Sequence, residues 1–195
     1  HSYLQQQNIP FDCAMAKSTN IRMFKTIRQY VDQANLELGA ERGSPKMMEG
    51  TGRRFAHTMS IAPTASNALI CGNVSPSCEP FRANAFRQDT LSGTFIQKNK
   101  YLDKIIKERT ENEEQYNKVW LDIVQHEGSI QYLDFFTDDN KEVFKTFAEI
   151  DMLWAVEHTA DRQDYIDQAQ SFNICIRPDI SIKRLHAIHF AAWKK

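Results

Sequence analysis

The 195-residue sequence lacks any excess of one charge and any long apolar run. Its formal net charge is −1, so no basic field would draw the chain to nucleic acid or to an anionic membrane surface. No apolar stretch is long enough to cross a bilayer, and no signal peptide opens the sequence. These absences argue against a nucleic-acid-binding protein and against a membrane protein.

Cysteine is scarce, and its spacing excludes several kinds of site. The four cysteines, Cys13, Cys71, Cys78 and Cys175, are scattered, which is typical of reduced thiols in a cytoplasmic protein. Cys71 and Cys78 do not have the spacing of a CxxC redox pair or zinc site, so we interpret them as ordinary thiols. The sequence also contains no Ser-His-Asp arrangement and no glycine-rich P-loop.

Three other features have both a functional and a structural interpretation. Asn173-Ile174-Cys175 echoes the Asn-x-Cys-x-Glu pattern of a radical-forming cysteine, but Arg177 stands in place of the carboxylate, so we favour a core cysteine. His186 and His189 could face the same way on a helix, but no further ligand lies at a suitable spacing, so no metal site is predicted. Arg53-Arg54 could reach an anion, although a solvated loop is the favoured interpretation.

Apolar periodicity predicts mostly helices. Strands are predicted over 58–62, 93–96 and 171–176, and a polar surface loop over 44–57. The predicted helices are one capped by Ser18 or Thr19 and stopped at Gly43, a short one over 65–70, others over 101–109 and 113–127, one from the cap Asp138 through Val156, and a last one capped by Ser181.

Few strands separated by long helices indicate an α/β fold with parallel strands. Such a sheet needs more strands than this sequence supplies. The sequence also begins at His1 without an initiator methionine and stops at Lys195 inside a predicted helix. We therefore expect residues 1–195 to form a single partial domain of a larger protein.

The most informative stretch is Ser60-Ile61-Ala62-Pro63-Thr64-Ala65-Ser66-Asn67, in which a short strand leads through a proline into small residues that open a helix. The first amides of a helix have no intrahelical partner, and the helix dipole is positive at that end. Small side chains let an anion approach the backbone. The stretch therefore predicts a phosphate site.

Several motifs together give the sequence a family resemblance. Ile61-Ala62-Pro63-Thr64-Ala65-Ser66, followed by Cys71-Gly72-Asn73 and Glu79-Pro80, resembles the phosphate-binding segment of the large subunit of class I ribonucleoside-diphosphate reductases. Similar markers follow in order: Thr90-Leu91-Ser92-Gly93-Thr94-Phe95, Glu127-Gly128-Ser129-Ile130-Gln131, Gln170-Ser171 with Asn173, and His189-Phe190 with Trp193-Lys194. The resemblance covers essentially the whole chain.

The resemblance implies the C-terminal portion of a ten-stranded α/β barrel, helix-rich and with few of the barrel's strands in this chain. It implies that Pro63, Thr64, Ala65, Ser66 and Asn67 bind the substrate diphosphate, although Asn67 departs from the hydroxyl residue often found there. The family reduces ribonucleoside diphosphates to deoxyribonucleoside diphosphates for DNA synthesis by thiyl-radical chemistry. None of the four cysteines here matches the family's radical or reducing cysteines, so no catalytic residue and no metal ligand is assigned.

The resemblance also implies partners. No cofactor is expected in this chain: a metal-containing small subunit would supply the radical, and thioredoxin or glutaredoxin the electrons. The N-terminal remainder of the large subunit would complete the barrel, and the large subunit would form a homodimer. We do not expect the chain to be active alone. The alternative is a non-catalytic phosphate-binding or assembly module on the same scaffold.

Overall fold

The computed structural model describes residues 1–91 and 93–195, so Ser92 of the Thr90–Phe95 motif lies outside the described residues. The elements in order are α1 (Ser2–Gln6), α2 (Ala14–Arg42), a 3₁₀ turn (Lys46–Met48), α3 (Ala65–Ile70), β1 (Ala85–Thr90), β2 (Gly93–Lys98), α4 (Lys100–Arg109), α5 (Glu113–Gln125), α6 (Asp138–Val143), α7 (Met152–Gln163) and α8 (Ile182–Lys194). The predicted helix-rich character with few strands is confirmed.

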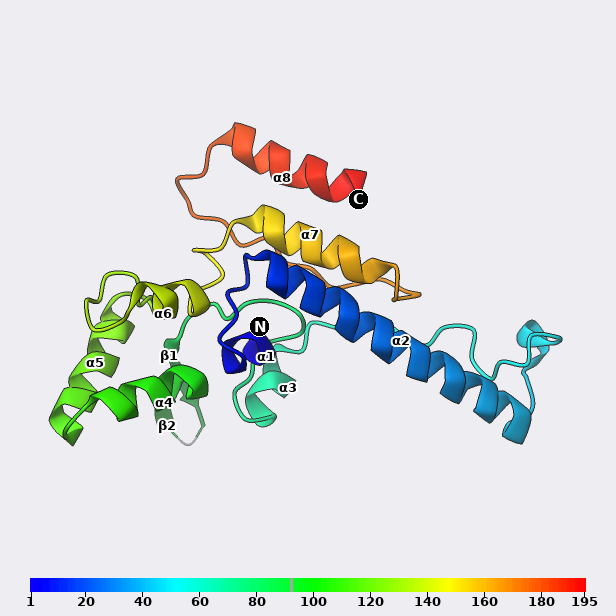
Figure 1. The fold of residues 1–195 in the computed structure, drawn as a ribbon, viewed down its shortest axis with the longest axis horizontal. Helices are drawn as coiled ribbons and strands as arrows, with labels where there is room; N and C mark the ends of the chain where they lie inside the picture. The colour runs from blue at the N-terminus through cyan, green and yellow to red at the C-terminus, as the bar shows by residue number, and fades with distance from the viewer. Residues whose placement is uncertain (92) are drawn as a thin grey trace.

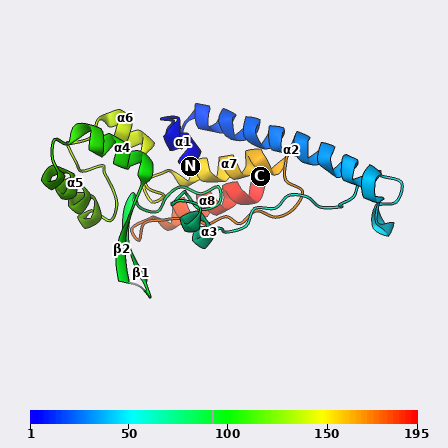
Figure 2. The same ribbon diagram turned by 90° about the horizontal axis from the view of Figure 1, so that it is seen from below.

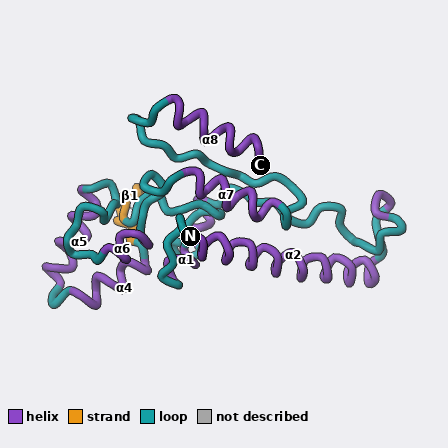
Figure 3. The backbone as a smooth tube through the Cα atoms, turned by 45° about the horizontal axis from the view of Figure 1, so that its top comes forward, coloured by secondary structure: helices purple, strands orange, loops and turns teal. Residues whose placement is uncertain are grey.

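Three long helices give the molecule its elongated shape. Figure 1 shows α2, α7 and α8 stacked and running in the same direction, with α4, α5 and α6 gathered at one end. After α2 and α7 the chain returns in extended segments, coloured as loops in Figure 3. Parallel helices separated by extended returns are the connectivity of α/β units, in agreement with the predicted fold class.

Among the described residues, the two return segments pair as strands at one position only. Ile61 and Gln170 form a single parallel bridge, and neither predicted strand, over 58–62 or 171–176, forms along its length. The strand prediction over 58–62 holds only at Ile61, and the one over 171–176 was wrong, because the bridge falls on Gln170. Parallel strands are stable when neighbours and helices cover them, and the described residues give each segment one neighbour at one position.

The only sheet among the described residues is an antiparallel hairpin, not the parallel sheet that the sequence suggested. β1 and β2 pair from Ala85 with Lys98 to Thr90 with Gly93. The predicted strand over 93–96 is confirmed within β2, whereas β1 was not predicted. Figure 2 shows the hairpin projecting away from the helices.

The observed starts of α5 and α8 agree with the predicted ones. Asn112 and Ser181 accept backbone hydrogen bonds at the starts of α5 and α8. The predicted start of α2 was wrong, because the helix begins earlier, with the Cys13 thiol accepting from the Ala16 amide. The predicted helix from Asp138 through Val156 is in fact two helices: Thr137 caps α6, and Asp151 caps α7.

The apolar core has two parts. One lies between β1, α4, α5 and the segment through α6, and it includes Leu102, Ile106, Trp120, Ile123, Ile130 and Phe144. The other packs α7 against α8 and the segment before α2, and it includes Phe11, Phe147, Ile150, Val156 and Ile188. None of the helices among the described residues combines the length and apolar character needed to cross a membrane.

Candidate functional site

The predicted phosphate turn lies on the surface at the start of α3. Thr64 is the residue before the helix and is half-buried, whereas Pro63, Ala65, Ser66 and Asn67 are exposed. The amides of the first helical turn have no intrahelical acceptor, so they are available to a ligand. The predicted short helix over 65–70 is confirmed as α3.

The side chains of the turn differ in what they contact. The Thr64 hydroxyl does not cap α3; instead its Oγ1 accepts a hydrogen bond from the Ser77 amide at 2.9 Å. Within the part of the chain that the structure describes, the side chains of Ser66 and Asn67 form no hydrogen bond. The Thr64 hydroxyl is therefore used to hold the turn, and Ser66 and Asn67 are free to meet a ligand.

A cavity of about 470 Å³ opens beside the turn. Pro63 and Ala65 line it, whereas Thr64, Ser66 and Asn67 do not, so the structure divides the five predicted residues between a wall and an exposed rim. The opposite walls come from the loop after α3, from the start of β1 and from the return segment after α7. We call this space the α3 cavity.

Polar groups that were not predicted as site residues also line the α3 cavity. Glu79 is 7% exposed, and its Oε1 accepts from the backbone amide and the side-chain Nδ2 of Asn173 at 2.9 and 2.8 Å. Arg82 is exposed at the same cavity and forms no ion pair with any described residue. Glu79 and Asn173 both occur in the motifs that carried the family resemblance, and that was the signal for them.

The segment before the turn is fixed by Asp167. Its carboxylate accepts from the Thr58 amide and hydroxyl, from the Met59 amide at 2.9 Å and from the Arg28 guanidinium at 3.0 Å. Burial alone would raise the pKa of Asp167, but these donors outweigh it and hold the pKa well below its usual range. Asp167 therefore stays ionised and ties the segment to α2.

The bridge between the return segments continues this attachment toward the turn. The Ile61 amide donates to the Ala169 carbonyl at 3.2 Å, and the Ser171 amide donates to the Ile61 carbonyl at 2.8 Å. Pro63 follows two residues later. The turn therefore begins from a segment that is held at Thr58 and again at Ile61.

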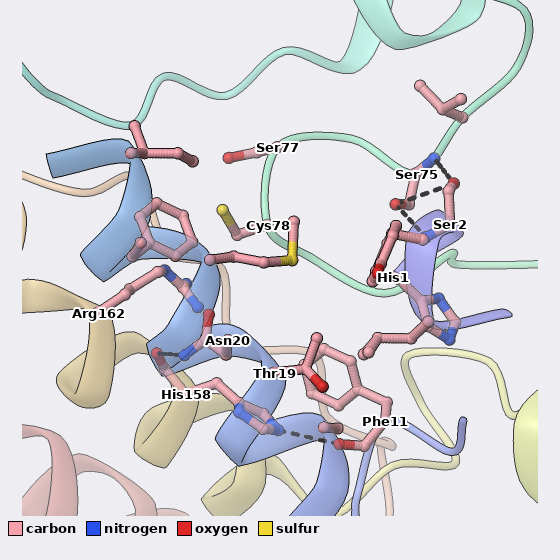
Figure 4. Close-up of a pocket in the computed structure, with 17 residues that line it drawn as sticks. His1, Ser2, Phe11, Thr19, Asn20, Ser75, Ser77, Cys78, His158 and Arg162 are labelled. Carbon is pink, nitrogen blue, oxygen red and sulfur yellow. Dashed lines mark hydrogen bonds between the residues drawn. The ribbon is translucent and has the colours of Figure 1, made fainter. Parts of the chain in front are cut away.

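A second cavity of about 310 Å³ lies on the other side of the loop after α3, and Figure 4 shows its lining. Arg162 and His158 enter it from α7. The Arg162 guanidinium donates to the Gln170 and Thr159 side chains, and burial lowers its pKa. Ser77 lines both cavities, so the loop that carries it separates them.

The other candidate residues from the sequence make contacts that hold the fold together. Cys175 is half-buried against the α7–α8 core, and burial raises the pKa of its thiol. Arg53 pairs with Asp32 at 3.2 Å, and Arg54 donates to the Gly43 carbonyl. All four cysteines are free thiols. Among the described residues, no cluster of three or more His, Cys, Asp or Glu side chains could hold a metal ion.

Comparison with known proteins places these features in context. The family model described as "Ribonucleotide reductase, barrel domain" matches residues 45–195. The chain is 52% identical over 196 residues to the ribonucleoside-diphosphate reductase large subunit of Invertebrate iridescent virus 6, and 46% identical over 193 residues to that of Invertebrate iridescent virus 3. These alignments cover 100% and 99% of this chain.

A solved structure agrees with the sequence relatives. The class Id ribonucleotide reductase alpha subunit of Actinobacillus ureae matches over 100% of this chain with a TM-score of 0.88 and 40% sequence identity. The chain spans only 20% and 31% of the two viral relatives and 35% of the solved chain.

Proposed function

The chain belongs to the ribonucleotide reductase barrel-domain family, and from that premise we propose that it forms part of a large subunit that reduces ribonucleoside diphosphates. In this proposal the segment binds the substrate diphosphate at Pro63, Thr64, Ala65, Ser66 and Asn67. The thiyl-radical step, which removes the ribose 3′-hydrogen and lets the 2′-hydroxyl leave as water, uses cysteines outside these 195 residues.

The proposal rests on one observation, the exposed start of α3 beside the α3 cavity. The free amides of the first turn of α3 and the unbonded side chains of Ser66 and Asn67 place several hydrogen-bond donors close together. Such a group of donors can bind an anion. A diphosphate on this rim would leave the ribose directed over the cavity that Pro63 and Ala65 line. Holding one end of the substrate in this way orients the reacting end.

The proposal includes partners for the chemistry that this chain does not carry. A metal-containing small subunit supplies the radical, and thioredoxin or glutaredoxin supplies the electrons through a cysteine pair. The N-terminal remainder of the large subunit completes the barrel, and the large subunit forms a homodimer. We place the assembled enzyme in the cytoplasm.

A charge substitution in the turn tests the proposal. In the complete large subunit, Ser66→Asp should raise the KM for a ribonucleoside diphosphate by at least about tenfold, because the new carboxylate repels the diphosphate. It should weaken competitive inhibition by inorganic pyrophosphate to a similar degree. Ser18→Asp adds the same charge at an exposed position of α2 and should leave both values unchanged.

The same assay separates the proposal from its alternative. Unchanged pyrophosphate inhibition in Ser66→Asp would refute the assigned turn. A non-catalytic module would bind pyrophosphate at this turn yet yield no deoxyribonucleotide when combined with the remainder of the large subunit and the small subunit.

A further inference from the structure

Glu79 is a buried carboxylate whose partner is an amide, not a cation. Its Oε1 accepts both hydrogen bonds from Asn173, and among the described residues no Lys, Arg or His forms an ion pair with it. A carboxylate that is 7% exposed is costly to bury without compensation. Attraction to the buried Arg162 guanidinium and the two charge-assisted bonds from Asn173 supply that compensation, and the bonds fix the two segments against each other.

This contact closes a ring of hydrogen-bonded residues, of which Ser77, Glu79 and Asn173 line the α3 cavity. The Ser171 amide donates to Ile61, and two residues along the chain Asn173 donates to Glu79. Two residues before Glu79, the Ser77 amide donates to the Thr64 hydroxyl. The chain between Thr64 and Ile61, which lies three residues earlier, completes the ring.

The loop on the Glu79 side is tightly turned. The Glu79 amide donates to the Pro76 carbonyl at 3.0 Å, and Ser77 has a φ of 51°, which a residue with a side chain adopts only when its surroundings impose it. The Pro76–Glu79 turn therefore sets the conformation of Ser77, and the bonds that Asn173 donates to Glu79 anchor the end of this turn. The Ser77 amide in turn sets the position of Thr64.

We propose that Glu79 is a positioning residue for the substrate diphosphate, acting through Asn173 on one side and through Ser77 and Thr64 on the other. This inference rests on the proposed function of the Pro63–Asn67 turn. Glu79 does not touch the diphosphate; it fixes the distance across the α3 cavity between the turn and the return segment after α7.

Matched variants of the two partners test the inference in the complete large subunit. Glu79→Ala should raise the KM for a ribonucleoside diphosphate and the inhibition constant of inorganic pyrophosphate about tenfold, with kcat within about twofold. Glu79→Gln should stay within about twofold of the wild type, because the amide oxygen still accepts both bonds from Asn173.

Asn173→Asp gives a second, independent test. It places a carboxylate of similar size against Glu79, so repulsion should raise the KM and the pyrophosphate inhibition constant. In the double variant Glu79→Gln with Asn173→Asp, the introduced amide can donate to the introduced carboxylate, and both constants should return toward the wild-type values. Gln131→Ala, which removes a side-chain bond to Lys141 elsewhere, should change neither constant.

The outcomes distinguish failure of the proposed function from failure of the role of Glu79. If pyrophosphate does not compete in the wild type, the proposed function fails and the role of Glu79 fails with it. If pyrophosphate competes and Ser66→Asp weakens it, but Glu79→Ala and Asn173→Asp leave both constants unchanged, the role of Glu79 alone is overturned. Failure of the double variant to improve on Asn173→Asp also overturns it.

Discussion

The Thr64 hydroxyl accepts a hydrogen bond from the Ser77 amide at 2.9 Å, across a loop that separates two cavities. The Thr64 oxygen thus already accepts a bond from the protein, and its O–H remains to donate to an anion. In the proposed diphosphate site, the amides and the side chains of Ser66 and Asn67 supply the other donors to the anion. Thr64 serves the turn by holding its shape.

We expect Thr64→Val to loosen the turn and Thr64→Ser to leave it intact. Valine removes the acceptor of the Ser77 amide, which costs about 1 kcal/mol in the free energy of unfolding, whereas serine keeps the hydroxyl. Urea unfolding of the two variants measures this cost. Pyrophosphate inhibition of the complete large subunit should weaken in Thr64→Val only, and equal inhibition in both variants would contradict this role.

Replacing Asp167 should destabilise the protein far more than replacing a surface acid. Asp167→Asn removes the charge that accepts bonds from Thr58, Met59 and Arg28, and we expect a loss of about 2 kcal/mol in the free energy of unfolding. Asp179→Asn removes an exposed ion pair with Arg177 and should change the free energy of unfolding by less than about 0.5 kcal/mol. Similar losses in urea unfolding would show that the Asp167 attachment contributes nothing beyond a surface charge.

The buried His158 predicts how stability varies with pH. Its Nε2 donates to the Phe11 carbonyl at 2.9 Å, and burial lowers its pKa below 6.5. The folded state therefore binds fewer protons than the unfolded state below about pH 6.5, so the free energy of unfolding should fall as the pH drops through this range. Chemical unfolding at pH 7.5 and pH 5 should show a smaller fall in His158→Gln. An equal fall in both proteins would exclude His158 as the cause.

Gly128 is required at the end of α5 for its lack of a side chain. It has a φ of 82°, and an added Cβ would lie 2.4 Å from the Ala83 Cβ and 2.8 Å from the Ala83 Cα. We expect Gly128→Ala to cost about 3 kcal/mol in thermal or urea unfolding, since backbone strain and a backbone clash add.

Gly50→Ala is the matched control for Gly128→Ala. Gly50 has a φ of 79°, close to that of Gly128, but an added Cβ would meet nothing within 4 Å, so only the strain of about 1 kcal/mol applies. Equal costs at the two positions would mean that the approach of Ala83 is not limiting.

The sequence predicted the elements whose signals are local. The helices α3, α4, α5 and α8 lie close to where local sequence placed them, and the last three begin directly after a side-chain cap, Asn99, Asn112 and Ser181. The predicted helix from Asp138 through Val156 failed because side chains there compete for the backbone. Glu149 accepts from the Thr146 amide and is bonded to the distant Ser129 hydroxyl, and Asp151 then caps a new helix.

The site was predictable only in part, for the same reason. The Pro63–Asn67 turn is a local pattern, and its place at the start of α3 follows from proline and small residues. The contacts that hold it join residues far apart in the sequence, such as Thr58 with Asp167 and Glu79 with Asn173. Periodicity carries no information about such pairs. The strand predictions over 58–62 and 171–176 failed likewise, since strand pairing depends on neighbours and not on the segment alone.

The contact between the two return segments also bears on the order in which the site forms. Thr58 and Asp167 are 109 positions apart, and Glu79 and Asn173 are 94 apart. A ribosome adds residues from the N-terminus, so the turn is synthesised long before the residues that hold it. The turn therefore acquires its final shape only after α7 and the segment behind it have emerged and docked. Until then we expect it to be a solvated loop, so pyrophosphate binding at the proposed site would report the completion of folding.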